Sequence, residues 1–292
     1  MKTNLLSTTV RTGAKQISKG LVLVAAGFFL HHDAQASLSM VNLGTASSYA
    51  VLAGSGITVT GPTTISGNIG TFPTTSITGI GNVTLTGVNH AGDAVTQLAK
   101  NDLVTAYNDA AGRSATVAYG GGYDLVGQTL VSGVYNGSSS LFLSGTLTLD
   151  AQGDPNAVWI FQAGSTLITA SSSRVNVING GQACHVFWQV GSSATLGTDT
   201  DFIGNILALT SITLNTGATL DGRALARNGA VTLDNNTITA SYCNRQVAAV
   251  PEPMPPQRWG RGSRAGCRRS RFRGATATCT PGGSGAVEPK DR

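Results

Sequence analysis

Threonine is the residue whose type and spacing in this chain most strongly suggest a chemistry. Residues 37–250 contain 29 threonines, a single lysine and no glutamate. When segment 203–219 is aligned with segment 221–237, Thr213 matches Thr232 and Thr219 matches Thr237. Ranks of β-branched side chains have stiff rotamers and present methyl and hydroxyl groups as an ordered array. The pattern predicts a flat, weakly polar binding face for a periodic partner, although threonine is also simply a good strand former.

The elements that must position these threonines follow from the repeat length. A repeat of about 18 residues is the size of one coil of a β-solenoid, in which each coil stacks on the last. Apolar and polar residues alternate in 57–60 and 83–86, as strands with one buried face require. Residues 91–111 instead carry a helical apolar stripe made of Ala94, Val95, Leu98, Ala99, Val104 and Tyr107. The sequence predicts an all-β solenoid with one long helix packed alongside.

Strand alternation sorts the outward threonines into ladders, because successive side chains point to opposite faces. With the leucines and isoleucines inward, one ladder is Thr195, Thr213 and Thr232. A second, at the following corner, is Thr198, Thr216 and Asn235, and beside it Asp201, Thr219 and Thr237 align.

The two ends of the chain differ from the region between them. Residues 1–36 resemble a secretory signal peptide, with four basic residues, the apolar run 21–30 and a small-residue cleavage pattern at 34–36. Residues 251–292 form a Pro/Gly-rich tail with a net charge of +6, predicted to be disordered, whereas 37–250 carries −4. An acidic domain argues against a nucleic-acid partner. The apolar run is too short to span a bilayer comfortably, so no membrane span is expected after cleavage.

Export permits disulfides, and Cys184 and Cys243 both lie in the 37–250 domain. They either pair or remain as two buried thiols. A disulfide between them would close a loop worth roughly 4 kcal/mol in the chain-entropy model.

Catalytic and metal-binding patterns are weak in this sequence. A polysaccharide-cleaving site needs close carboxylates, and the coils offer Asp199, Asp201 and Asp221 with Arg223 and Arg227 beside them. These residues are read as structural. His90 and His185 lack partners at metal-ligand spacing. The prediction is therefore a protein with no catalytic residues, no metal and no cofactor.

At several motifs the chain resembles the ice-binding protein family built on the DUF3494 domain. The resemblance covers about residues 43–239 and rests on 154–162 (DPNAVWIFQ), 186–191 (VFWQVG), 204–208 (GNILA) and 221–226 (DGRALA). It implies a right-handed, discontinuous β-helix of triangular section with a helix alongside, and a flat face that adsorbs to ice. Members often carry Thr-(Ala/Gly)-x-(Thr/Asn) on that face. Residues 216–219 match it fully, 169–172 match in part, and 198–201 place two aspartates in it.

The resemblance and the ladders together give one set of candidate ice-binding residues. These are Thr169, Ser171, Thr195, Thr198, Thr200, Thr213, Thr216, Thr219, Thr232, Asn235 and Thr237. The expected protein is a secreted monomer whose partner is an ice surface.

The alternative is a non-catalytic cell-surface or matrix adhesin that holds a polysaccharide or another surface component. The start of the tail, 250–253 (VPEP), resembles a PEP-CTERM sorting signal, but the apolar helix of that signal is missing. The tail is read as a degenerate or frame-shifted signal, or as an ordinary solvated basic segment.

Overall fold

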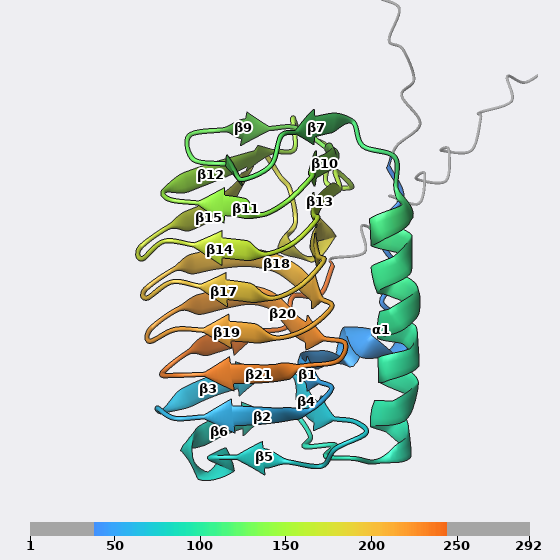
Figure 1. The fold of residues 1–292 in the computed structure, drawn as a ribbon, viewed down its shortest axis with the longest axis vertical. Coiled ribbons are helices and arrows are strands. Elements are labelled where there is room, and N and C mark those ends of the chain that lie inside the picture. Colours follow the sequence, from blue (N-terminus) through green and yellow to red (C-terminus); the bar gives the residue numbers. More distant parts are fainter. Residues whose placement is uncertain (1–37, 244–292) are drawn as a thin grey trace, which may run out of the picture. The chain divides into compact units, whose positions relative to one another are not determined.

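A computed structural model describes residues 38–243. The predicted leader, residues 1–36, and the predicted tail, residues 251–292, lie outside the described residues. The described chain winds into stacked coils with three faces, flanked by one long helix (Figure 1). No helix within residues 38–243 is long and apolar enough to cross a membrane.

Each face of the solenoid is a parallel sheet. The flat face is an eight-stranded sheet, one strand per coil, in the order β5-β2-β21-β19-β17-β14-β11-β8. Its strands are β2 (Gly56–Val59), β5 (Ile77–Thr78), β8 (Tyr123–Asp124), β11 (Leu141–Leu143), β14 (Leu167–Thr169), β17 (Ala194–Leu196), β19 (Ile212–Leu214) and β21 (Ala230–Leu233).

The other two faces share two long strands that turn a corner, β18 (Asp201–Ala208) and β20 (Thr219–Ala226). The helix face takes their C-terminal halves together with β1 (Tyr49–Ala53), β4 (Asn68–Thr71), β7 (Val117–Tyr119), β10 (Gly133–Gly137), β13 (Trp159–Ala163) and β16 (Val186–Val190). The third face takes their N-terminal halves with β3 (Thr63–Ser66), β6 (Val83–Thr86), β9 (Thr129–Leu130), β12 (Thr146–Asp150), β15 (Arg174–Ile178) and β22 (Thr237–Thr239). Short 3₁₀ turns η1 (Gly44–Ser48), η2 (Ile80–Asn82) and η3 (Ala183–His185) complete the described elements.

Glycine allows the two long strands to bend between faces. Gly204 and Gly222 are paired in the ladder between β18 and β20 and have φ of 118° and 156°. A Cβ on Gly222 would lie 1.9 Å from the carbonyl oxygen of Gly204. A side chain at this position is therefore excluded by the close approach of the backbones as well as by the positive φ.

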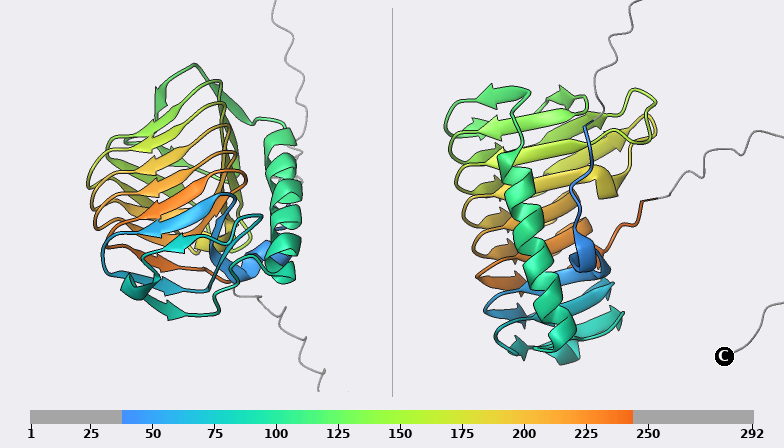
Figure 2. Two further views of the ribbon diagram at one scale, coloured as in Figure 1. Left: turned by 60° about the horizontal axis from the view of Figure 1, so that its bottom comes forward. Right: turned by 90° about the vertical axis from the view of Figure 1, so that its right-hand side faces the viewer.

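The coils do not stack in sequence order. The coil built from β1, β2 and β3 pairs with β20, β21 and β22, so the N-terminal coils extend the C-terminal end of the stack. Helix α1 (Ala94–Gly112) then carries the chain to the opposite end, where β7 begins (Figures 1 and 2). Eight strands give seven spacings, or about 34 Å, and a helix of 19 residues covers about 28 Å of that distance. The predicted discontinuous β-helix with one long helix alongside is confirmed.

The helix begins and ends close to the predicted bounds, but it buries a different stripe. Asp93 caps its N-terminus by accepting a hydrogen bond from the Thr96 N–H at 2.8 Å. The buried positions are Thr96, Ala99, Lys100, Leu103, Ala106, Tyr107 and Ala110. Leu98 and Val95 were predicted to face the sheet and are 57% and 48% exposed. The prediction was wrong for these two residues and right for Ala99 and Tyr107, because the side of the helix that meets the sheet is centred on Ala99, Leu103, Ala106 and Ala110.

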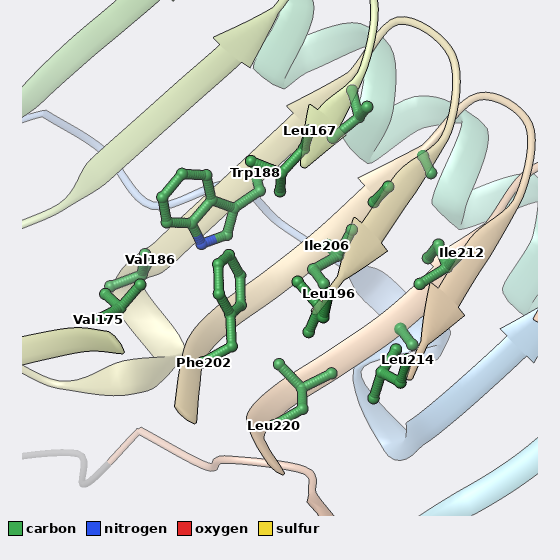
Figure 3. Close-up of a cluster of buried hydrophobic side chains, with 14 of the residues drawn as sticks. Leu167, Val175, Val186, Trp188, Leu196, Phe202, Ile206, Ile212, Leu214 and Leu220 are labelled. Atoms are coloured by element: carbon green, nitrogen blue, oxygen red, sulfur yellow. The ribbon is translucent and has the colours of Figure 1, made fainter. Parts of the chain in front are cut away.

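The core inside the coils is mainly aliphatic and contains an aromatic stack that runs along the solenoid. The rings of Phe161 and Trp188 are 4.0 Å apart, and Phe202 continues the stack 4.9 Å from Trp188 (Figure 3). The indole N–H of Trp188 donates to the Ile203 carbonyl at 2.9 Å, which satisfies the only polar atom of that side chain. Trp159 is likewise fully buried, and both tryptophans belong to the core, as expected from their apolar surroundings.

Candidate functional site

One row of threonines runs across the outer side of the flat face. Thr195 is in register with Thr213, and Thr213 with Thr232, as the ladder predicted. The row continues through Thr58 in β2, which is in register with Thr232, and then through Thr78 in β5, which is in register with Thr58. Five threonines from five coils therefore stand side by side, about 4.8 Å apart.

Thr58 and Thr78 were not among the predicted site residues. Ile57-Thr58-Val59 resembles Val231-Thr232-Leu233, and this similarity was the available signal. The pairing itself joins residues more than 170 positions apart in the chain, because the N-terminal coils stack on the C-terminal coils. A ladder followed in sequence order stops at Thr232.

The opposite end of the same row is apolar. Ile168 follows Thr195, and Phe142 follows Ile168, before the row ends at Asp124. A second row runs beside the first, two residues earlier along each strand, and consists of small residues. Its members are Gly56, Ala230, Ser211, Ser193, Thr166 and Ser140. The hydroxyls of Ser140 and Thr166 lie 2.7 Å apart, which links neighbouring coils. The outer side of the flat face is thus regular and uncharged over most of its length, with small residues toward β5 and larger apolar residues toward β8.

The corner between the flat and third faces holds Thr198 and Thr216 of the second predicted ladder, but the predicted alignment of Asn235 with them was wrong. The link from β21 to β22 is one residue shorter than the link from β19 to β20, so Asp234 takes the position beside Thr216 and accepts a hydrogen bond from its hydroxyl. The backbone N–H of Asp199 donates to the Thr216 carbonyl at 3.0 Å, and that of Gly217 to the Asp234 carbonyl at 3.2 Å. Ser172, Asp199, Gly217 and Asn235 all have φ between 53° and 76°. These positions need residues that tolerate the left-handed region. The aspartate that departs from the family motif at 199 therefore occupies a turn position.

Two predicted site residues are in the interior. Thr169 and Thr200 are 3% and 0% exposed, and their hydroxyls lie 3.0 Å apart. Thr169 takes the inward position held by Leu196 and Leu214 in the next coils, because it is in register with Leu196. Its hydroxyl also accepts from the Gly197 N–H at 2.8 Å. Both threonines are structural, and the expectation that they are outward is corrected. Ser171 and Thr198 remain at the corner surface.

The remaining candidates, Thr219 and Thr237, lie on the third face, in register with Asp201. The Thr219 hydroxyl donates to the Asp201 carboxylate at 2.8 Å, and Arg174 approaches the same carboxylate at 3.5 Å. The candidates thus fall on two faces and the corner between them, rather than on one face.

The charged groups weighed for catalysis are engaged in structural contacts. Arg223 is 3% exposed and donates to the Ser47 carbonyl at 2.9 Å and to the Asn205 side chain at 2.8 Å. Burial lowers the pKa of Arg223. Arg227 lies over the Tyr107 ring at 4.7 Å, and Asp221 accepts a hydrogen bond from Ser241. These contacts hold η1, α1 and the C-terminal segment against the coils.

The single lysine of the domain is also structural. Lys100 is 8% exposed, and its ammonium donates to the Ala226 carbonyl at 2.6 Å and to the Arg227 carbonyl. Desolvation, with a smaller contribution from the positive charge of Arg227, lowers the pKa of Lys100 to about 8. The lysine therefore fastens α1 to the end of β20 instead of charging the surface.

Cys184 and Cys243 form a disulfide, so the first of the two alternatives holds. With His185 they make the one group of three metal-ligating side chains found within residues 38–243. Because both sulfurs are bonded to each other, they are not available as thiolate ligands. His185 is buried, and desolvation lowers its pKa.

Comparison with known proteins shows the family to which this chain belongs. The sequence model of the ice-binding-like family matches residues 51–239. The chain belongs to the ice-binding-like family. An ice-binding protein of Nostoc sp. (strain HG1) is 50% identical over 236 residues, which cover 80% of this chain and 86% of that protein. An ice-binding protein of Colwellia sp. is 37% identical over 75% of this chain and 90% of its own length.

Solved structures of this family share the fold. The crystal structure of an ice-binding protein from the Antarctic ascomycete Antarctomyces psychrotrophicus superposes with a TM-score of 0.68 at 44% identity, over 70% of this chain and all of that one. The family resemblance noted at the sequence motifs is therefore confirmed, including the β-helix it implied.

Proposed function

We propose that this protein adsorbs to ice through the outer side of the flat face, without catalysis. The observation that carries the proposal is the row Thr78, Thr58, Thr232, Thr213 and Thr195, which repeats one side chain at one register over five coils. Relatives named ice-binding proteins, at up to 50% identity, support the same partner.

The physical basis of adsorption is an array ordered in advance. The threonine rotamers are stiff, and four of the five strands are held by a neighbouring strand on both sides, while β5 is the edge strand. Ordering water or meeting a lattice therefore costs the protein little conformational entropy. Each threonine contributes one methyl group and one hydroxyl, repeated about every 4.8 Å along the row. No single residue dominates, because every coil contributes the same small contact.

We further propose that the protein acts outside the cell as a monomer. The leader pattern at residues 1–36 and the Cys184–Cys243 disulfide support an oxidising, exported setting. The threonine row is complete within one chain, so no second copy is needed to build it.

Nanolitre osmometry on the purified full chain tests the proposal. The wild type should shape ice crystals into facets and separate the melting and freezing points. Thr213→Tyr and Thr232→Tyr place bulk in the middle of the row and should remove most of that gap. Thr105→Tyr is the matched control, because Thr105 lies exposed on α1 and the substitution is the same. Thr216→Tyr asks whether the corner also contacts ice.

Circular dichroism must show the same fold for all variants. Round crystals and no gap from folded wild-type protein would overturn ice binding. A full gap in both row variants would move the contact to another face.

A further inference from the structure

A second threonine array lies on the third face, at the end of the solenoid where β6 forms the edge. Thr84, Thr64 and Thr237 are in register across β6, β3 and β22, and Thr219 follows in β20. Two residues along each strand, Thr86, Ser66 and Thr239 form a parallel row in the same three strands. Neighbouring side chains in this patch are about 4.8 Å apart from coil to coil, and the two rows are about 6.7 Å apart along the strands.

The hydroxyls of this patch have no partners in the part of the chain that the structure describes. Thr64, Thr84, Thr86, Thr237 and Thr239 are all exposed, and their side chains make no hydrogen bond within residues 38–243. In the flat-face row Thr78 is exposed as well, whereas the other four threonines are half-exposed. Strand propensity explains the residue type, but it does not require two uncharged rows in register over three coils.

Charged side chains border this patch only on the side away from β6. Beyond Thr219 the same row continues with Asp201 and Arg174, whose side chains lie 3.5 Å apart. Beyond Thr239 the other row meets Asp221. Toward β6 all six outward positions are threonine or serine. A protein or polyanion partner is normally met by charged or large apolar groups, and the patch offers neither.

The patch is continuous with the flat face. The strands that carry it, β3, β6 and β22, directly follow β2, β5 and β21 in the same coils, so both arrays are joined by one set of corners (Figure 1). Both arrays therefore share the coil spacing, the side-chain chemistry and the rigid support, and they face different directions.

We propose that Thr84, Thr64 and Thr237, with Thr86, Ser66 and Thr239, form a second ice-contacting surface. One molecule then has two inclined arrays and engages two differently oriented sets of ice planes. This inference rests on the proposed function, because it assigns the same partner to a second face.

The test is plane-resolved adsorption to a single-crystal ice hemisphere, with a fluorescent protein fused to the C-terminus of the full chain. Two double variants are compared with the wild type: Thr64→Tyr with Thr237→Tyr on the third face, and Thr213→Tyr with Thr232→Tyr on the flat face. The single variant Thr105→Tyr on α1 is the control. The wild type and the control should label two sets of planes. Each face pair should lose one set and keep the other.

The outcomes separate the two claims. Absence of labelling by the folded wild type overturns both the proposed function and this inference. If the wild type labels ice and the third-face pair gives the wild-type pattern, only the second surface is wrong. Should the third-face tyrosines lower the melting temperature, Thr64→Lys with Thr237→Lys replaces them, because lysine brings a hydrated charge into the array on a flexible chain instead of a rigid ring. Retention of both plane sets in that folded pair also overturns the inference.

Discussion

At the scale of single residues, the structure separates threonines that build the fold from threonines that face solvent. Thr169 and Thr200 bond to each other inside a corner, whereas Thr213 and Thr232 point outward from neighbouring strands. The sequence assigns the outward set by alternation, which is sound within a strand. Alternation within β14 does place Thr169 inward, two residues after Leu167, so its place among the candidates came from the partial family motif. Alternation gives no guide at Thr200, which lies in the turn before β18, where the chain leaves the extended conformation.

Asp102 offers a residue-scale prediction about pH. Its carboxylate accepts hydrogen bonds from the Thr45 N–H at 2.7 Å and the Thr45 hydroxyl at 2.6 Å, joining α1 to η1. The Thr45 hydroxyl and N–H bonds lower the pKa of Asp102. A depressed carboxylate pKa adds stability that is present above the unfolded-state value of about 3.9 and is lost as the pH falls through the folded-state value.

Asp102→Asn should therefore lower the melting temperature at pH 7 and reduce its further fall between about pH 4 and 2. Thermal melts of wild type and variant across this range measure the difference. Parallel acid curves, offset by a constant, would show that the Asp102 carboxylate does not carry this dependence. Asp109→Asn is a useful comparison, because Asp109 lies on the same helix and pairs locally with Arg113.

At the scale of elements, two glutamines dock the helix on the solenoid. Gln162 and Gln189 are in register in β13 and β16. The Gln162 amide donates to the carbonyls of Ala110 and Arg113, both at 2.8 Å, and Gln189 donates to the Tyr107 hydroxyl at 2.8 Å. Gln162 therefore satisfies carbonyls at the helix C-terminus that have no intrahelical partner.

Replacing Gln162 separates the hydrogen bonds from the packing. Gln162→Met keeps the volume and should cost about 1–3 kcal/mol of unfolding free energy, because buried carbonyls lose their donor. Gln162→Glu should cost more, since a carboxylate cannot donate and its charge would face carbonyl oxygens at the negative end of the helix dipole. Urea unfolding at pH 7 measures both. Equal stability of the two variants would contradict this account of the docking.

The helix also shows where sequence patterns stop. Its existence and approximate bounds were predictable from a clear change in periodicity, whereas the capping role of Asp93 came from the structure. The buried stripe of the helix was not predictable, because the choice between Leu98 and Leu103 depends on which side the sheet lies. The sheet brings Leu52, Leu207 and Leu225 against α1 from strands far apart in the chain.

At the scale of the whole described domain, stability rests on closing a stack whose order differs from the sequence. The Cys184–Cys243 disulfide joins residues 59 apart, beside the segment where the described chain ends. Cross-linking a loop of this length removes entropy from the unfolded chain, worth about 4 kcal/mol in the chain-entropy model.

Cys184→Ala with Cys243→Ala should therefore lower the unfolding free energy by about 2–4 kcal/mol while leaving the fold and the threonine faces intact. Urea unfolding of the variant, the oxidised wild type and the thiol-reduced wild type makes the comparison. The reduced wild type should behave like the variant. If the variant were as stable as the oxidised protein, the disulfide would add nothing to the unfolding free energy, and contacts between the coils would account for all of it.

The sequence alone determined the class of the fold, the coil repeat, the presence of one helix and the inner part of the flat-face row. These depend on short-range periodicity, which adjacent residues record directly. Only the tertiary structure decided that Thr58 and Thr78 extend the row, that Thr200 is buried, and that a second array stands on the third face. Each of these depends on which coil stacks on which, and α1 reverses that order by carrying the chain from one end of the stack to the other. Register between β2 and β21, or between β3 and β22, arises from packing between distant segments, and a similarity of short segments such as 57–59 and 231–233 does not by itself say that they pair.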